Sequence, residues 1–274
     1  MNSKADRTAS KSRTEPWWAP HEVPDGRSLR LGLGPLELVI GHDSGQWLVR
    51  VEHGPEADTA ARARVSVRRG LPEDFEQRFV QAASGEQVVI SPRLADRPVV
   101  IRPYQPLFLL SGQEVTLYLS TPLWLSIRAG NPPALLREVP SVPLSDTWLG
   151  PSSREGEICY AGKTGARQRL ADLPVRPHRA ITPLRIRNNA PEPLPLEKVS
   201  LPVPLLSLYG AADASLWTQR VNLVREDASD QASVRVETAA PDIGRSLELV
   251  SSPRQEGRFG MIRAFGRILR TVTP

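Results

Sequence analysis

The sequence has one cysteine, four lysines and no long hydrophobic run. Because Cys159 is the only cysteine, an intrachain disulfide is excluded and a zinc site would lack its usual set of thiolate ligands. No stretch approaches the roughly 20 apolar residues of a membrane-spanning helix. The first residues are charged and contain no apolar segment, so they do not resemble a signal peptide. We therefore expect a cytoplasmic protein.

Lysine is scarce, and the positive charge comes almost entirely from arginine. The formal net charge is +5 for the whole chain. Residues 254–270 hold five arginines and one glutamate, a net +4, so the remainder is close to neutral. A broad basic face, typical of proteins that bind nucleic acid, is not expected. We accordingly expect neither nucleic acid nor a nucleotide as a partner.

Proline is abundant, with 27 residues scattered along the chain. Scattered proline interrupts long helices because it lacks a backbone donor and clashes with the preceding turn, whereas strand ends and loops tolerate it. From Arg27 onward, short alternating or apolar segments are separated by turn residues, as at Asp43-Ser44-Gly45. Residues 221–226 and 232–237 form a predicted hairpin around 227–230. This pattern predicts a mainly β protein with two β-sandwich-like domains, the second immunoglobulin-like in the broad sense.

The segment 131–156 is rich in proline, serine and glycine, and is the expected crossover between the two domains. One helix is predicted at 71–83, where Phe75, Phe79 and Val80 share a face. The expected parts are a disordered tail at 1–15, an N-terminal β domain at 16–140, a C-terminal β-sandwich domain at 141–253 and a basic amphipathic helix at 254–274.

The string Gly162-Lys163-Thr164 looks like the end of a phosphate-binding loop. Such a loop requires a glycine five residues before Gly162, but Glu157 occupies that position. A strand-like apolar segment also lies where the loop itself should be. We therefore interpret the string as a hairpin turn in which Gly162 and Gly165 supply unusual backbone dihedrals.

The chain has four histidines, and His42 beside Asp43 suggests catalysis. No nucleophile elbow accompanies this pair. His42 and His53 could meet across a hairpin, but two histidines make an incomplete metal site. We interpret the histidines as surface or strand-end residues and expect no metal and no cofactor.

A candidate ligand site consists of Asp146, Trp148 and Tyr160. These residues, with Cys159, could line a cleft where two sandwich domains meet, and ligand sites favour domain interfaces. In the alternative interpretation, Trp148 fills the seam between the domains, because large aromatic side chains mostly serve burial. Asp146 then holds a turn through its own backbone.

The C-terminal segment GRFGMIRAFGRILR, residues 257–270, is predicted to form an amphipathic basic helix. Such a helix suits an anionic membrane surface or an apolar groove on a partner. A terminal helix packed on a sandwich would show the same apolar stripe. The candidate contact residues are Phe259, Ile262, Arg263, Phe265, Arg267, Leu269 and Arg270.

Three segments resemble a known prokaryotic family. They are PLWLSIR at 122–128, LSDTWLG at 144–150, and PLRIRN followed by PLPLEKVSLPVPLLSLYG at 183–210. The family is the domain-of-unknown-function family four hundred and thirty-two, and the resemblance extends from about Leu29 to Val250. It implies a β-rich cytoplasmic protein of bacteria or archaea and carries no established catalytic residues.

These observations favour a non-enzymatic cytoplasmic binding or accessory module that acts through protein–protein contacts. A second hypothesis is a regulatory protein that associates with the membrane surface, or with a membrane protein, through the C-terminal basic helix. A third is a small-ligand or carbohydrate-active enzyme with its site at the domain junction, since sandwich folds host many such activities.

Overall fold

The computed structural model describes most of the chain. Within the described residues the protein is mainly β, and its only helical elements are two short 3-10 turns, η1 (Leu170–Asp172) and η2 (Val203–Leu205). No helix in this part of the chain is long and apolar enough to cross a membrane. The expected disordered tail at 1–15 lies outside the described residues. The described ranges are 16–56, 62–81, 85–105, 107–150, 152, 154–229, 231–257 and 259–266.

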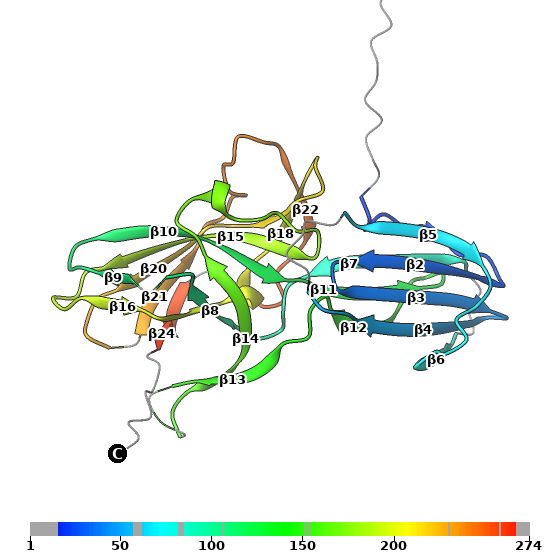
Figure 1. Ribbon diagram of the computed structural model, residues 1–274, viewed down its shortest axis with the longest axis horizontal. Coiled ribbons are helices and arrows are strands. Elements are labelled where there is room, and N and C mark those ends of the chain that lie inside the picture. Colours follow the sequence, from blue (N-terminus) through cyan, green and yellow to red (C-terminus); the bar gives the residue numbers. More distant parts are fainter. Residues whose placement is uncertain are drawn as a thin grey trace, which may run out of the picture.

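Two sheets form one half of the molecule, the N-lobe, at the right of Figure 1. Buried residues of both sheets, such as Leu31 and Ile127, belong to one hydrophobic cluster. The first sheet has the order β5 (Arg64–Arg69), β2 (Arg27–Leu33), β3 (Leu36–Asp43), β4 (Gln46–His53) and β6 (Gln77–Val80). The second has the order β1 (His21–Glu22), β7 (Gln87–Arg93), β11 (Trp124–Ala129) and β12 (Ala134–Pro140).

Three further sheets form the other half, the C-lobe. An eight-stranded sheet has the order β22 (Leu247–Ser251), β18 (Leu208–Ala211), β19 (Leu216–Thr218), β15 (Arg179–Asn188), β20 (Val221–Arg225), β21 (Gln231–Val236) and β23 (Phe259–Arg263), with β10 (Glu114–Pro122) also paired to β15. A five-stranded sheet has the order β13 (Ser145–Leu149), β14 (Glu157–Ala166), β8 (Val99–Pro103), β17 (Lys198–Leu201) and β24 (Phe265–Gly266). A small third sheet pairs β16 (Leu194–Leu196) with β9 (Leu107–Leu109).

The turn predicted at Asp43-Ser44-Gly45 and the hairpin predicted around 227–230 are confirmed. Strands β3 and β4 pair antiparallel with Asp43 opposite Gln46. Between them Ser44 and Gly45 have φ values of 49° and 78°, and two consecutive positive φ angles are typical of a type I′ hairpin turn. Strands β20 and β21 also pair antiparallel, and Asp227 Oδ1 accepts a 2.8 Å hydrogen bond from the backbone of Ser229 in the loop between them.

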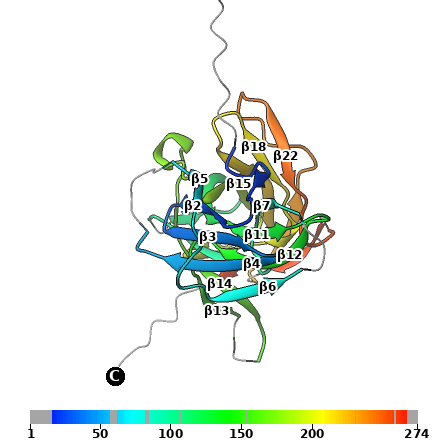
Figure 2. The same ribbon diagram turned by 90° about the vertical axis from the view of Figure 1, so that its right-hand side faces the viewer.

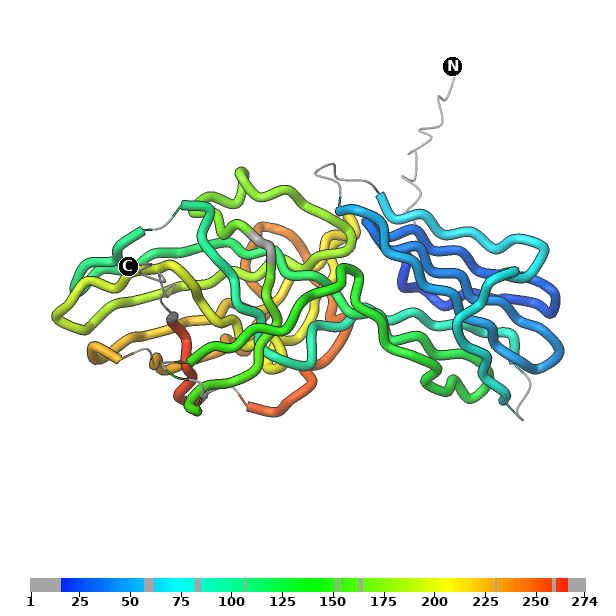
Figure 3. The backbone as a smooth tube through the Cα atoms, turned by 60° about the horizontal axis from the view of Figure 1, so that its bottom comes forward, coloured from blue at the N-terminus to red at the C-terminus, as the bar shows by residue number. Residues whose placement is uncertain are grey.

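The strand pairing crosses the expected boundary between residues 140 and 141. Strands β8, β9 and β10 pair with strands of the C-lobe, and the chain then returns to the N-lobe for β11 and β12. It enters the C-lobe again between Pro140 and Ser145, within the segment expected as a crossover. Figure 3 shows these passages between the lobes.

One hydrophobic core runs through both lobes, although no sheet of the described chain spans them. The same cluster contains Leu31 of the N-lobe and Leu184 of the C-lobe. At the seam Trp17 is buried and meets Trp18 edge to face, with 5.4 Å between ring centroids. Trp18 in turn lies against Gly210 of β18. Figure 2 looks along the long axis with the N-lobe nearest and shows the C-lobe directly behind it.

The predicted C-terminal amphipathic helix is wrong. Residues 259–266 form β23, paired with β21, and β24, paired with β17, so this segment passes from one C-lobe sheet to another. Ile262 packs on the core, Phe265 is buried and Met261 is exposed. Gly260 and Gly266 weaken a helix, while β21 and β17 provide strand edges that need pairing. Phe259 and Arg263 lie on β23, and Arg267, Leu269 and Arg270 lie outside the described residues.

Two other local predictions are also wrong. Within 71–83, Gln77–Val80 form the edge strand β6 beside β4 in place of a helix, because sheet pairing overrides a weak local propensity. The Gly162-Lys163-Thr164 string lies inside β14 and not in a turn. The parallel pairing of β14 with β8 shifts register between Ala161 and Gly165.

Candidate functional site

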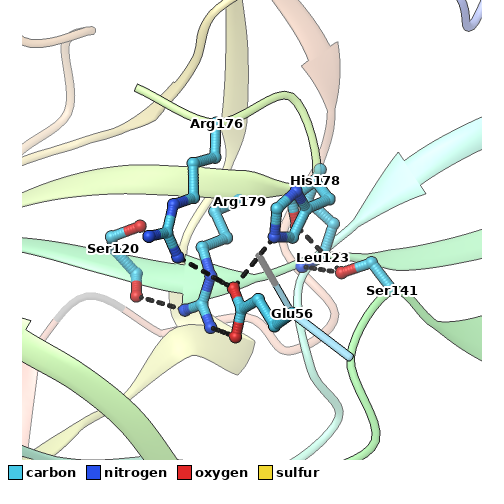
Figure 4. A network of polar contacts seen from close by, with 7 residues as sticks. All are labelled: Glu56, Ser120, Leu123, Ser141, Arg176, His178 and Arg179. Atoms are coloured by element: carbon cyan, nitrogen blue, oxygen red, sulfur yellow. Dashed lines mark hydrogen bonds and ion pairs between the residues drawn. The ribbon is translucent and has the colours of Figure 1, made fainter. Parts of the chain in front are cut away.

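The largely shielded carboxylate of Glu56 joins the two lobes (Figure 4). Glu56 follows β4 of the N-lobe, and its partners lie just before or at the start of β15 in the C-lobe. Its Oε1 accepts hydrogen bonds from Arg179 Nε at 2.6 Å and Arg176 Nη1 at 3.0 Å. Its Oε2 accepts a 2.8 Å bond from Arg179 Nη2, so the Arg179 contact is bidentate. His178 Nε2 lies 3.0 Å from Oε1. We call these four residues the Glu56 network.

The Glu56 network is largely shielded from water. The side chains of Arg179 and His178 are 2% and 3% exposed, and that of Glu56 is 21% exposed. Burial alone would raise the pKa of Glu56, but hydrogen bonds from His178 and Arg179 and the charge of Arg179 hold this pKa well below its ordinary value. Glu56 is therefore an anion at neutral pH, and His178 Nε2 donates the proton in their contact. Separating the lobes would leave the guanidinium of Arg179 without its counter-ion, which is costly for a charge shielded from water.

Hydrogen bonds tie two more segments of the chain, residues 120–123 and Ser141, to the network. Arg179 Nη1 donates a 2.9 Å bond to the carbonyl oxygen of Ser120 on β10. The hydroxyl of Ser141 donates to the carbonyl oxygen of His178 at 2.8 Å and accepts from the backbone N–H of Leu123 at 3.0 Å. Ser120 and Leu123 lie at the passage from β10 to β11, and Ser141 lies between β12 and β13, so they mark where the chain passes between the lobes. Figure 4 labels all three residues. The network therefore positions the lobes and is a structural site.

The predicted ligand residues Asp146 and Tyr160 do lie together. They are opposite each other on β13 and β14. Arg97 Nη1 donates to Asp146 Oδ1 at 3.2 Å, and its guanidinium lies 5.2 Å from the centre of the Tyr160 ring. The Tyr160 hydroxyl donates to Asp96 Oδ1 at 2.9 Å, and burial together with this bond raises its pKa. Tyr160 also contacts Trp124 of the N-lobe, with 5.2 Å between ring centroids, so this cluster borders the seam.

Trp148 and Cys159 lie away from that cluster. The Trp148 indole donates to the carbonyl oxygen of Ser152 in its own hairpin at 2.7 Å. Its side chain is 44% exposed, and that of Ile158, directly opposite on β14, is 53% exposed. Cys159 is fully buried against Val100 and Leu149. Trp148 therefore does not fill the seam between the lobes.

Cys159 is expected to be chemically inert in the folded protein. Burial and the neighbouring charge of Glu157 raise the pKa of its thiol to about 12. Because the thiolate is the reactive form, a thiol reagent at mildly alkaline pH should modify the native protein negligibly and the denatured protein completely. Absorbance of the released reagent chromophore measures both. Modification of the native protein at the rate of a free cysteine would contradict this expectation.

The histidines do not form a shared site. His42 lies near the end of β3, as expected, but is buried, and its Nδ1 is 3.0 Å from the carbonyl oxygen of Val23. His53 Nε2 is 2.8 Å from the carbonyl oxygen of Pro140. Within the part of the chain that the structure describes, no three histidine, cysteine, aspartate or glutamate side chains are grouped to hold a metal ion.

Sequence reasoning missed the Glu56 network. The run Arg176-Pro-His178-Arg179 does place three basic side chains ahead of a predicted strand, which is a weak signal. Glu56 carries no local signal, since 123 positions separate it from Arg179.

The chain matches a known protein family. The family described as Protein of unknown function (DUF432) matches residues 17–270, which include both lobes and the Glu56 network. No curated protein and no solved structure matches the chain. The protein therefore belongs to the DUF432 family.

Proposed function

We propose that this protein is a non-enzymatic binding or accessory module of the cytoplasm that acts through protein–protein contacts, with β13 as its contact edge. The observation that carries the proposal is that β13 is an edge strand of the five-stranded sheet. Within that sheet β13 pairs only with β14. Its hairpin with β14 projects from the C-lobe (Figures 1 and 2). The exposed Trp148 and Ile158 lie side by side on this hairpin.

An edge strand with exposed apolar side chains suits the addition of a strand from another protein. The outer row of backbone N–H and C=O groups supplies main-chain hydrogen bonds, and side chains that alternate along the added strand supply specificity. Tryptophan is enriched among residues that dominate binding energy. Because the bond to Ser152 holds the Trp148 indole in place, little side-chain freedom remains to be lost on binding.

Photo-crosslinking in cells that make the protein naturally tests this proposal. A photoreactive amino acid is placed at Ile158, and the matched control carries it at Val80, an exposed apolar residue on the edge strand β6 of the N-lobe. We expect a protein adduct at Ile158 that is absent at Val80. Adding Trp148→Ser should reduce the adduct about tenfold or more, since truncating a dominant contact costs roughly 2 kcal/mol or more.

Circular dichroism of the Trp148→Ser protein serves as the folding control, because an exposed side chain should contribute little to the fold. Equal adducts at both positions, no adduct at either, or an adduct indifferent to Trp148→Ser would each contradict the proposal.

The enzyme hypothesis has one observation in its favour. Two carboxylates, Asp96 and Asp146, flank Tyr160 and both contact Arg97. We rank it second because both carboxylates are exposed and neutralised by the same guanidinium, an arrangement that typically holds a loop in place. Replacing Asp96 and Asp146 by asparagine should abolish binding of a soluble oligosaccharide if the hypothesis holds.

The membrane hypothesis loses its basis, because it relied on the C-terminal helix.

Two β-sandwich-like domains, the second immunoglobulin-like in the broad sense, remain a prediction for this fold. In each lobe, buried residues of separate sheets share the hydrophobic cluster, which supports two β-sandwich-like units. The second unit is immunoglobulin-like only in the broad sense, since β15 pairs in parallel with both β19 and β20, whereas immunoglobulin sheets are antiparallel.

A further inference from the structure

Three arginines lie near enough to act electrostatically on one another where the C-lobe contacts one sheet of the N-lobe. Arg93 ends β7 and Arg128 lies on β11. In the register of these strands Arg93 is opposite Trp124, and because side chains alternate between faces, Arg128 lies on the same face as Trp124. Arg254 comes from the C-lobe, between β22 and β23. We call these residues the seam arginines.

Arg254 is held firmly across the seam. Its Nε donates a 2.7 Å hydrogen bond to the carbonyl oxygen of Leu94, and its Nη2 lies 2.8 Å from Glu138 Oε2 on β12. Its backbone N–H bonds to the carbonyl oxygen of Pro204 in its own lobe at 2.9 Å. Arg254 therefore reaches the sheet face of Arg93 and Arg128 only when the lobes are docked.

Positive charge exceeds negative charge in this cluster. Glu138 is the one carboxylate that acts on Arg93 in the described part of the chain, and it is already paired with Arg254. Neither Arg93 nor Arg128 forms an ion pair with any described residue. Burial, together with repulsion from Arg254 and Arg128, lowers the pKa of Arg93.

Arg93 also leaves a hydrogen-bond donor unused. Its Nε is buried and has no hydrogen-bond partner among the described residues. Leaving a buried donor of a charged group unpaired is costly, and native proteins rarely do so. A ligand that brings negative charge and several acceptor oxygens to this position would satisfy the donor and relieve the repulsion among the three guanidinium groups.

We infer that the seam arginines bind a phosphate group, either as inorganic phosphate or as a phosphomonoester. Guanidinium groups match the oxygens of a phosphate with paired hydrogen bonds. Arg93 and Arg128 supply the charge that lacks a counter-ion, and Arg254 closes the site from the other lobe. Because the site requires docked lobes, phosphate binding stabilises the folded two-lobe state by RT ln(1 + L/Kd), where L is the concentration of free phosphate. The inference goes beyond the proposed β13 contact and does not depend on it.

Thermal unfolding and calorimetric titration of the full chain test the inference. The probes are inorganic phosphate and glycerol phosphate, with ionic strength held constant by chloride. We expect a saturable calorimetric isotherm with a measurable Kd, and a Tm that continues to rise with the logarithm of phosphate concentration above that Kd. Arg93→Gln and Arg128→Gln should each weaken Kd about tenfold or more, the usual cost of a lost charge-assisted hydrogen bond.

The matched control is Arg187→Gln, which removes an exposed arginine from β15 of the C-lobe and should leave Kd unchanged. Arg128 is exposed, so its variant should fold even if Arg93→Gln does not. A measurable Kd for inorganic phosphate or for glycerol phosphate would support the inference. The probe with the lower Kd would identify the source of the phosphate group. A calorimetric signal that does not saturate, or stabilisation that chloride reproduces or that persists in Arg128→Gln, would overturn it.

Discussion

Replacing Glu56 by glutamine is expected to lower the free energy of unfolding by about 3 kcal/mol or more. Glutamine has nearly the same shape but carries no charge, so the guanidinium of Arg179 stays buried without its counter-ion. Breaking a buried ion pair from one side is far more costly than removing an exposed one. Chemical denaturation followed by circular dichroism measures the change.

The control is Glu52→Gln. Glu52 is an exposed glutamate that contacts Arg50 near the end of β4, the strand that precedes Glu56. That substitution should change stability by less than about 1 kcal/mol. Equal effects of the two substitutions would contradict the role assigned to the Glu56 network.

The stability difference between the wild type and Glu56→Gln should also depend on pH. In the folded state the pKa of Glu56 lies below the ordinary value of 4.5, so the folded protein binds fewer protons than the unfolded chain in the acid range. The contribution of Glu56 is therefore fully present above about pH 4.5 and declines as pH falls from there toward the folded pKa. Denaturation curves of both proteins across the acid range should converge.

Replacing Gly34 by alanine is expected to destabilise the protein by more than about 3 kcal/mol. Gly34 lies in the turn between β2 and β3 with a φ of 62°, a conformation that costs other residues about 1 to 2 kcal/mol. A Cβ at this position would also collide with the ring of His178. Relieving the collision would displace His178 from Glu56 and disturb the seam between the lobes.

Gly112→Ala separates these two contributions. Gly112 has a similar φ of 72°, but a Cβ there meets nothing within 4 Å. Its cost should be limited to the backbone strain of about 1 to 2 kcal/mol. In a protein that already carries His178→Ala, Gly34→Ala should lower the free energy of unfolding only by this backbone strain of about 1 to 2 kcal/mol. If Gly34→Ala and Gly112→Ala lower the free energy of unfolding by the same amount in the wild-type background, the collision with His178 does not contribute to the effect.

Local patterns predicted the class of secondary structure and several of its turns. Alternating apolar residues and scattered proline indicated short strands, and Asp43-Ser44-Gly45 indicated a tight turn because these residue types are common in turns. The family resemblance relied on segments that contain all or part of β11, β13, β15, β16, β17 and β18. These features depend on residues a few positions apart, so a linear sequence shows them directly.

Helical periodicity was misleading at both places where it was used. The apolar stripes at 71–83 and 257–270 fit a helix, but the described parts of both segments contain strands at the edges of existing sheets. A three-to-four residue spacing in a short segment is compatible with either structure. The choice depends on whether a partner strand has an unpaired edge, and that edge comes from a remote part of the chain.

The sequence by itself determined that the protein is mainly β, where its clearest turns lie and to which family it belongs. Only the tertiary structure decided that the chain returns to the N-lobe for β11 and β12, and that Asp146 and Tyr160 lie together while Trp148 faces solvent. It also decided that Glu56 meets Arg179, 123 positions away. The physical reason is that burial and ion pairing depend on distances in space, and strand pairing between remote segments sets those distances.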